Sequence, residues 1–115
     1  MRDHMKLKAF HLADELALQA YRETAFFPSE ERYGLTRQLR RAAMSVASNI
    51  VEGCARRTEA DFLHFLDIAH GSARELEYQL SLAVRLTFLP SQSKLPEQAI
   101  EVSKTLNALI RSLRD

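Results

Sequence analysis

Apolar residues recur along this chain at steps of three and four, the spacing that places them on one face of an α-helix. Four such stripes follow one another, with turn-forming residues between them. The first predicts a helix over about residues 6–26 that ends at Pro28, and Thr58 and Asp61 before the third resemble an N-terminal capping box. The stripes consist of Phe10, Ala13, Ala17, Ala20, Thr24 and Phe27; Leu35, Leu39, Ala43, Val46 and Ile50; Phe62, Leu66, Ala69, Ala73, Leu76, Leu80 and Ala83; and Leu95, Ala99, Val102, Leu106, Leu109 and Leu113.

The connections between the four stripes are short, so neighbouring helices should run antiparallel. The second helix weakens at Gly53, and the third should reach about Phe88 before the stretch LPSQSKLP turns the chain. We predict an all-α protein, one domain over residues 1–115 that folds as an antiparallel up-down four-helix bundle. Composition agrees, because helix-forming residues dominate and the chain has only three glycines and three prolines.

The cellular compartment is predicted from three absences in the sequence. Cys54 is the only cysteine, so it cannot form an intrachain disulfide. The N-terminal region has no apolar run typical of a secretory signal, and no segment is apolar enough for a membrane span. We therefore expect a cytoplasmic protein with no membrane partner. Arg56 and Arg57 could favour the thiolate of Cys54, but a buried structural cysteine is the preferred interpretation.

The net charge of +1 conceals an uneven distribution of charge along the chain. Residues 28–57 contain six arginines and three glutamates, whereas residues 58–90 contain two arginines and five acids. In the basic segment, Arg37 and Arg41 should point away from the core while Arg40 lies to one side. Arginine offers a planar fork of donors that suits phosphate, so these three are the expected nucleic-acid-binding residues.

These arginines also have interpretations that involve no nucleic acid. Arg40 could pair with Glu77 or Glu75 on the third helix and neutralise a carboxylate beside the core. Arg37 and Arg41 repel each other at their spacing of four residues, and a neighbouring subunit could relieve this repulsion as well as an external anion could. Both alternatives stay open at the level of sequence.

A second set of apolar residues lies outside the stripes that the bundle itself needs. On the second helix they flank the basic side, and on the third helix they face away from the core stripe. Exposed apolar strips on two helices suggest a subunit interface, although longer first and fourth helices could cover them instead. We expect self-association through Met44, Ala47, Val51, Ile68, Tyr78, Leu82 and Leu86.

No arrangement typical of a catalytic or metal site stands out. The four histidines do not bring three ligands together, and Ser72 has no evident base or oxyanion device. We predict no catalytic residues, no metal ligands and no cofactor, and we interpret Gly71 and Ser72 as small residues for close helix packing. Tyr21, Tyr33 and Tyr78 could stack bases, although covering the ends of a bundle is the commoner role.

Two stretches give the chain a family resemblance. QLRRAAMSVASNIVEG, residues 38–53, and FLHFLDIAHGSARELEYQL, residues 62–80, resemble the four-helix bundle proteins encoded in 23S ribosomal RNA intervening sequences. That family is similar to the accessory variability determinant of diversity-generating retroelements, a pentameric barrel that binds nucleic acid and a reverse transcriptase. The resemblance implies a ring of copies, with the pentamer as the expected size and nucleic acid as the leading partner.

The resemblance also bears on individual residues of the second helix. The arginines named above match its motif and could carry a nucleic-acid role. Asn49 and Glu52 match its N-I-x-E-G part and imply structural roles: the Asn49 amide could bridge helices, and Glu52 should pair with Arg56. Ala47 and Ala55 stand where the family often has proline and glycine, and alanine should keep both turns helical.

The sequence thus predicts a non-enzymatic, homo-oligomeric helical bundle that binds RNA or DNA through clustered arginines without strong sequence preference. An alternative is a protein–protein adaptor, for example for a polymerase, with no direct nucleic-acid contact. A third is a purely structural bundle whose only partners are its own copies.

Overall fold

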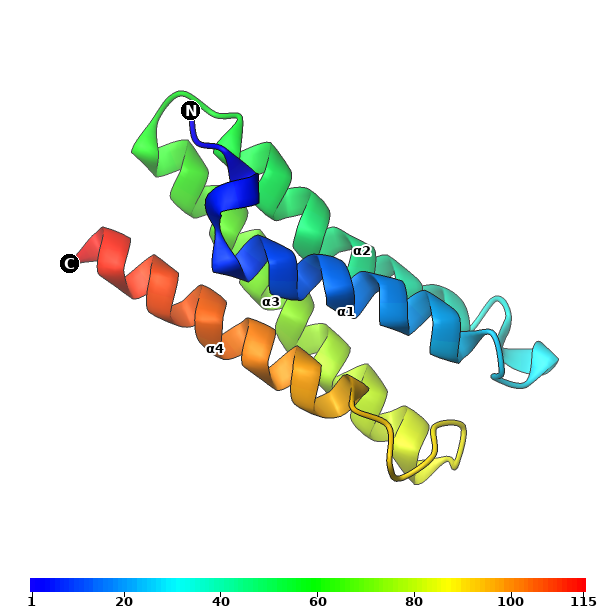
Figure 1. The fold of residues 1–115 in the computed structure, drawn as a ribbon. Coiled ribbons are helices and arrows are strands. Elements are labelled where there is room, and N and C mark those ends of the chain that lie inside the picture. The colour runs from blue at the N-terminus through cyan, green and yellow to red at the C-terminus, as the bar shows by residue number, and fades with distance from the viewer.

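The computed structural model describes all 115 residues and contains helices and turns but no strand. The four long helices run alternately up and down (Figure 1). Each packs against the next helix in the chain, and α1 also packs against α4, so the predicted antiparallel four-helix bundle is confirmed. In chain order the elements are the 3-10 turn η1 (His4–Lys6), α1 (Lys8–Thr24), the 3-10 turn η2 (Ser29–Glu31), α2 (Leu35–Cys54), α3 (Glu59–Arg85) and α4 (Leu95–Arg114).

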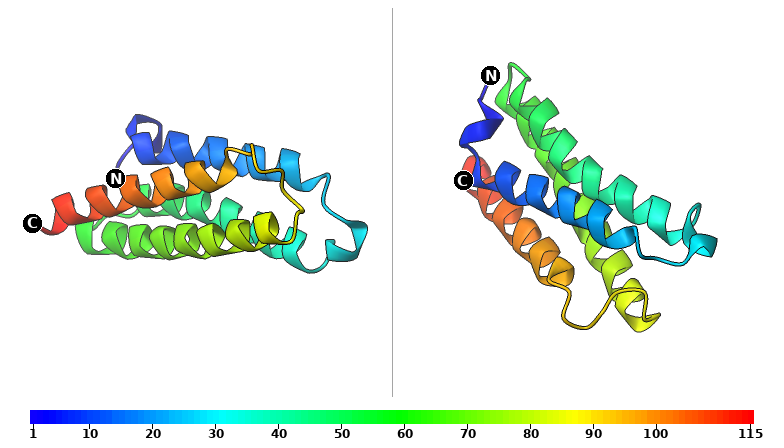
Figure 2. Two further views of the ribbon diagram at one scale, coloured as in Figure 1. Left: turned by 90° about the horizontal axis from the view of Figure 1, so that it is seen from below. Right: turned by 45° about the vertical axis from the view of Figure 1, so that its right-hand side comes forward.

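The bundle is elongated, with extents of 43 × 22 × 19 Å. Figure 2 shows both chain termini at one end and the α1–α2 and α3–α4 connections at the other. None of the four helices combines the length and the apolar character that crossing a bilayer requires. The end that holds the two connections also holds four of the six arginines of the basic segment, because residues 28–41 lie in the α1–α2 connection and the first turns of α2.

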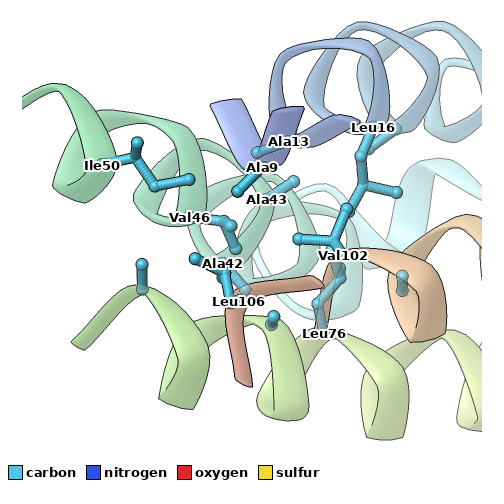
Figure 3. Packing of buried hydrophobic residues seen from close by; sticks show 14 of the residues in the cluster. Ala9, Ala13, Leu16, Ala42, Ala43, Val46, Ile50, Leu76, Val102 and Leu106 are labelled. Carbon is cyan, nitrogen blue, oxygen red and sulfur yellow. The ribbon is translucent and has the colours of Figure 1, made fainter. Parts of the chain in front are cut away.

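The core consists of 24 buried apolar side chains along the bundle axis (Figure 3). Every stripe residue predicted for α3 is buried. In the first and the fourth stripe four of the six predicted residues are buried and the other two are only partly buried. Leu16 is fully buried and reaches toward Val102, while Ala17 is only partly buried. Likewise Ile110 is buried and Leu109 lies at the edge. Steps of three and four fix a helix face only to within about one residue, so packing against the neighbouring helices decides which of two adjacent residues is buried.

Local capping sets the ends of α3. The hydroxyl of Thr58 accepts a hydrogen bond from the N–H of Asp61 at 3.1 Å, which confirms the side-chain cap predicted there. At the other end Thr87 has a φ of 63°, a left-handed conformation that is costly for a β-branched residue. This turn allows the N–H of Phe88 to donate to the carbonyl of Ala83 at 2.9 Å, so the helix ends earlier than predicted.

Two family-motif residues of α2 make local contacts. Glu52 pairs with Arg56 at 2.8 Å, as predicted. The Asn49 amide stays on its own helix, where it donates to the carbonyl and hydroxyl of Ser45 at 2.8 and 2.9 Å. Ser45 then bonds Ser72 of α3 at 2.8 Å, hydroxyl to hydroxyl. The predicted bridge by the Asn49 amide is therefore wrong, and the hydrogen bond between the two helices at this point joins Ser45 and Ser72.

Cys54 is a structural residue at the end of α2. Only 1% of its surface is exposed, and its carbonyl accepts a hydrogen bond from the N–H of Arg2 at 2.8 Å. Burial raises the pKa of the Cys54 thiol, an effect that the positive charge of Arg2 reduces and the carboxylate of Asp3 reinforces. The thiol is therefore neutral at ordinary pH, and the interpretation as a buried structural cysteine is confirmed.

Helices α2 and α3 approach closely at Gly53. A Cβ atom built there would lie 2.9 Å from the Cβ of Phe65 and 3.4 Å from both Cδ1 and the carbonyl oxygen of Phe62. The Phe65 Cβ is attached directly to its backbone and cannot swing away as the tip of a long side chain could. Only a hydrogen atom fits at this position without moving one helix relative to the other.

We expect Gly53→Ala to lower the free energy of unfolding by about 1–2 kcal/mol. The clash outweighs a gain in helix propensity of at most about 1 kcal/mol. Urea denaturation followed by circular dichroism measures the change. Asn107→Ala, at an exposed position of α4, is the control and should stay within about 0.5 kcal/mol of the parent. A Gly53→Ala protein as stable as the parent would contradict the close approach.

Candidate anion-binding site

A hollow of about 600 Å³ lies where α1 passes into α2. Its wall comes from the last turn of α1, the connection and the first two turns of α2. The structure brings Arg37, Arg40 and Arg41 together there and adds Arg32, which the sequence analysis did not select although it lies in the same basic segment. No lining residue is acidic. The hollow is lined by Tyr21, Thr24, Ala25, Phe27, Pro28, Ser29, Arg32, Tyr33, Thr36, Arg37, Arg40 and Arg41.

The connection that forms the floor of the hollow is fixed at two points. Phe27 is buried and its ring lies 5.7 Å from that of Phe88, which ties this connection to the neighbouring one. The carboxylate of Glu31 accepts the N–H of Leu35 at 3.1 Å and so caps α2. Gly34 leaves room for this cap, because a Cβ there would lie 2.9 Å from the Glu31 oxygen. Glu31 is thus engaged with the helix end, while the carboxylate of Glu30 accepts the hydroxyl of the lining residue Ser29 at 3.1 Å.

Arg40 joins the two helices of the hollow. Its Nε donates to the hydroxyl of Thr24 at 2.8 Å, and its Nη2 donates to the carbonyl of Tyr21 at 3.2 Å. The guanidinium also stacks on the Tyr21 ring, 4.8 Å from the ring centre. Thr24 in turn donates to the carbonyl of Ala20 at 2.6 Å, so its hydroxyl is fully used. Arg40 therefore closes the C-terminal end of α1.

The predicted pairing of Arg40 with Glu77 or Glu75 is wrong. Glu77 accepts from Arg74 at 3.2 Å and from the hydroxyl of Ser103 on α4, with 19% of its side chain exposed. The reason is the direction of the Arg40 side chain, since that flank of α2 faces α1 whereas the opposite flank faces α3.

Arg37 and Arg41 project from the outer side of α2. Both are exposed, and neither takes part in any side-chain hydrogen bond or any of the ion pairs of the structure, which use Arg2, Arg56, Arg74 and Arg114. Their Cβ atoms lie one helical turn apart, about 5–6 Å. Two like charges at this separation repel each other, and a bound anion between them would relieve the repulsion.

The residues predicted for a subunit interface divide into two groups. Ala47, Val51 and Leu82 are partly buried, and Ala47 packs against the core rather than forming part of an exposed strip. The other four are left uncovered by α1 and α4, so the alternative of full coverage is wrong for them. Their exposed fractions are 53% for Met44, 39% for Ile68, 62% for Tyr78 and 47% for Leu86.

Gly71 lies in the middle of α3 on the same exposed face as Ile68 and Tyr78. A Cβ atom at Gly71 would meet nothing within 4 Å, so the close packing predicted for this glycine is not found inside the bundle. Glycine in a helix interior costs about 0.5–1 kcal/mol relative to alanine. Nothing within the chain offsets that cost, and the gap leaves room for a second molecule to approach closely.

The chemistry of the hollow is that of binding. Thr36 and Ser29 contribute hydroxyls beside the four guanidinium groups, but no histidine or carboxylate lines the hollow to act as a general base. Nowhere in the chain do three or more histidine, cysteine or acidic residues gather as metal ligands. Fixed positive charges and hydrogen-bond donors suit phosphate or carboxylate groups.

Comparison with known protein families identifies the family of this chain. A family model described as 23S rRNA-intervening sequence protein matches residues 5–108. The chain belongs to this family. A protein of unknown function from the S23 ribosomal protein family of Bacteroides thetaiotaomicron VPI-5482 has a similar crystal structure, with a TM-score of 0.82 and 25% identity over 90% of this chain and 95% of that chain. No curated protein matches the chain. Neither name indicates an enzymatic family.

In this member of the 23S rRNA-intervening sequence family, the two arginines of the QLRR motif differ in their surroundings. Arg40 is bonded to α1, whereas Arg41 is exposed. We expect Arg40→Ala to lower the free energy of unfolding by about 1.5–3 kcal/mol, because the variant cannot form the two hydrogen bonds that the charged guanidinium donates. Arg37→Ala and Arg41→Ala are the matched controls and should each change stability by no more than about 0.5 kcal/mol. Urea denaturation measures all three, and equal effects would show that Arg40 is not the structural one.

Proposed function

We propose that this protein is a non-enzymatic, homo-oligomeric bundle that binds the backbone of RNA or DNA without strong sequence preference. The observation that carries the proposal is the pair Arg37 and Arg41, both exposed and without a protein partner, in a hollow that holds two further arginines and no acid. Guanidinium groups suit phosphate geometry, and contacts to phosphate carry no sequence information.

A single chain offers few phosphate contacts. Each contact contributes about −0.9 to the slope of log affinity against log salt for duplex DNA, and about −0.7 for a single strand. Two to four arginines therefore give modest, salt-sensitive binding. Several copies on one polyanion would raise the overall affinity, because each later contact is made at a high effective concentration. Assembly is thus part of the proposed function.

A second copy of this chain is the proposed occupant of the exposed apolar side chains of α2 and α3. Met44 and Tyr78 are more than half exposed, and Gly71 leaves open space on the same face of α3 as Tyr78. Glu75 lies on α3 between Gly71 and Tyr78, is exposed and forms no ion pair, whereas Arg41 on α2 is also unpaired. The surface therefore carries unpaired charges of both signs that a copy could complement. The family resemblance implies a pentameric ring.

We infer no catalytic activity, because the hollow is lined by hydroxyl groups but by no histidine or carboxylate that could activate them. We also keep the cytoplasm as the proposed compartment, in which a lone free cysteine such as Cys54 is common.

A protein–protein adaptor is the second candidate, favoured by the same exposed apolar side chains. In that case the arginines would recognise acidic side chains of a partner such as a polymerase. Co-purification with and without nuclease separates the two, because a partner held through nucleic acid is released by the nuclease and a directly bound protein is retained.

We expect Arg37→Gln with Arg41→Gln to weaken binding of a labelled RNA by at least about tenfold at low salt. The salt slope should become shallower by about 1 for each phosphate that the variant no longer neutralises. Fluorescence anisotropy at several salt concentrations measures both quantities. The control is Lys104→Gln with Arg111→Gln, two exposed cations on α4 that form no ion pair. Equal weakening by both double variants would reduce the effect to net charge and contradict the proposed site.

Self-association has its own test. We expect Met44→Glu with Tyr78→Glu to lower the mass measured by light scattering, because buried carboxylates would oppose contact between copies. Helix content measured by circular dichroism should be unchanged, since both side chains are exposed. Leu18→Glu is the control, at a residue of α1 that is 46% exposed and lies outside the predicted interface. A mass unaffected by the double variant would remove the proposed interface.

A further inference from the structure

The α1–α2 connection exposes aromatic rings that the fold does not use. Phe26 is 88% exposed and Tyr33 is 76% exposed. Phe26 directly precedes the buried Phe27, and Tyr33 lies two residues after Glu31, which caps α2. The adjacent Phe27 is buried and packs against Phe88, so the connection already has its hydrophobic anchor. The commoner role of such aromatics, covering the end of the bundle, is therefore taken by Phe27 and does not explain the other two rings.

Two exposed tyrosines line the hollow together with its arginines, whereas Phe26 belongs to the same connection without lining the hollow. Tyr33 lines the hollow itself, with the guanidinium of Arg32 5.9 Å from its ring centre. Tyr21 lines the opposite wall and is 43% exposed, with Arg40 stacked on its ring. Phe26 belongs to the same connection, one residue before the lining residue Phe27. Free aromatic faces interleaved with guanidinium groups are the combination that single-strand-binding proteins use, because bases stack on rings while cations hold the backbone.

A duplex cannot use these rings. Its bases are stacked on one another and paired, so only phosphates and groove edges are available to a protein surface. An unpaired nucleotide presents both its phosphate and its base face. The hollow has the volume to take a single nucleotide, because about 600 Å³ falls within the range of about 300–1,000 Å³ that small-molecule sites occupy. An acidic peptide would use the guanidinium groups but leave the aromatic faces unused.

We propose that the α1–α2 connection selects unpaired nucleotides over duplex, with Phe26 and Tyr33 stacking bases while Arg37 and Arg41 hold the adjoining phosphates. This inference rests on the proposed nucleic-acid binding and names its substrate class as single-stranded RNA or DNA. The aromatic residues supply the discrimination between single strand and duplex, and the arginines supply the affinity that both forms share.

The test compares a labelled single-stranded oligoadenylate with a duplex of the same length at one salt concentration. We expect the parent protein to bind the single strand at least about tenfold more tightly. Phe26→Leu with Tyr33→Leu should reduce single-strand affinity by about tenfold or more and leave duplex affinity and the salt slope unchanged. The matched variant Phe26→Tyr with Tyr33→Phe keeps both rings and should retain the preference.

Three results would overturn the inference: equal affinity of the parent protein for single strand and duplex, an effect of the leucine variant on both forms alike, or binding of polyglutamate as tight as that of the single strand. Failure of the proposed function is distinguishable from all three. It would show as no binding of either nucleic acid, or as binding that Arg37→Gln with Arg41→Gln leaves unchanged. Both aromatic positions are exposed, so the variants should fold, which circular dichroism checks.

Discussion

The contact between Arg40 and the last turn of α1 is the interaction on which the rest of the candidate site depends. The final carbonyls of a helix have no partner within it, and this end of the helix carries partial negative charge. Arg40 meets both needs through the carbonyl of Tyr21 and the hydroxyl of Thr24. Because Arg40 is held against α1, it forms a fixed part of the wall of the hollow, while Arg37 and Arg41 line the hollow without a protein partner. Of the three arginines on these two turns of α2, Arg40 therefore stabilises the fold, whereas Arg37 and Arg41 face solvent.

A chain with a net charge of only +1 can carry a basic site because four arginines gather in the lining of the hollow and no acid does. One acid, Glu30, lies beside the hollow, where it accepts the hydroxyl of the lining residue Ser29 at 3.1 Å. Glu31 caps α2 through the N–H of Leu35, and Glu23 accepts the hydroxyl of Ser93 at 2.7 Å. Neither carboxylate lines the hollow. The local potential therefore follows the four guanidinium groups rather than the average of the chain, and average charge is a poor guide to polyanion binding in a small bundle.

Much of the fold could be predicted from the sequence because a buried helix face imposes a period that few other structures share. The limits appear where one residue decides the outcome. Leu16 displaced Ala17 from the core by size, Thr87 adopts a left-handed turn that its β-branched side chain disfavours, and Arg40 turned to α1 instead of α3. Phe27, by contrast, was predicted in the stripe and is buried, while Phe26 beside it is exposed. Contacts between helices, which decide the outcomes for Leu16 and Arg40, are not encoded in spacing along one helix.

The proposed nucleic-acid site and the proposed contact between copies both include residues of α2, so binding at one can change the affinity at the other. Met44 follows Arg41 by three residues, so contact between copies near Met44 would bring the arginines of different copies toward the same edge. A strand that spans two copies would then favour assembly, and by reciprocity assembly would raise affinity for the strand by the same factor. If instead Arg41 pairs with Glu75 of a neighbour, strand and neighbour compete for one guanidinium and the coupling changes sign. The sign of that coupling therefore distinguishes a guanidinium that faces nucleic acid from one that belongs to the interface.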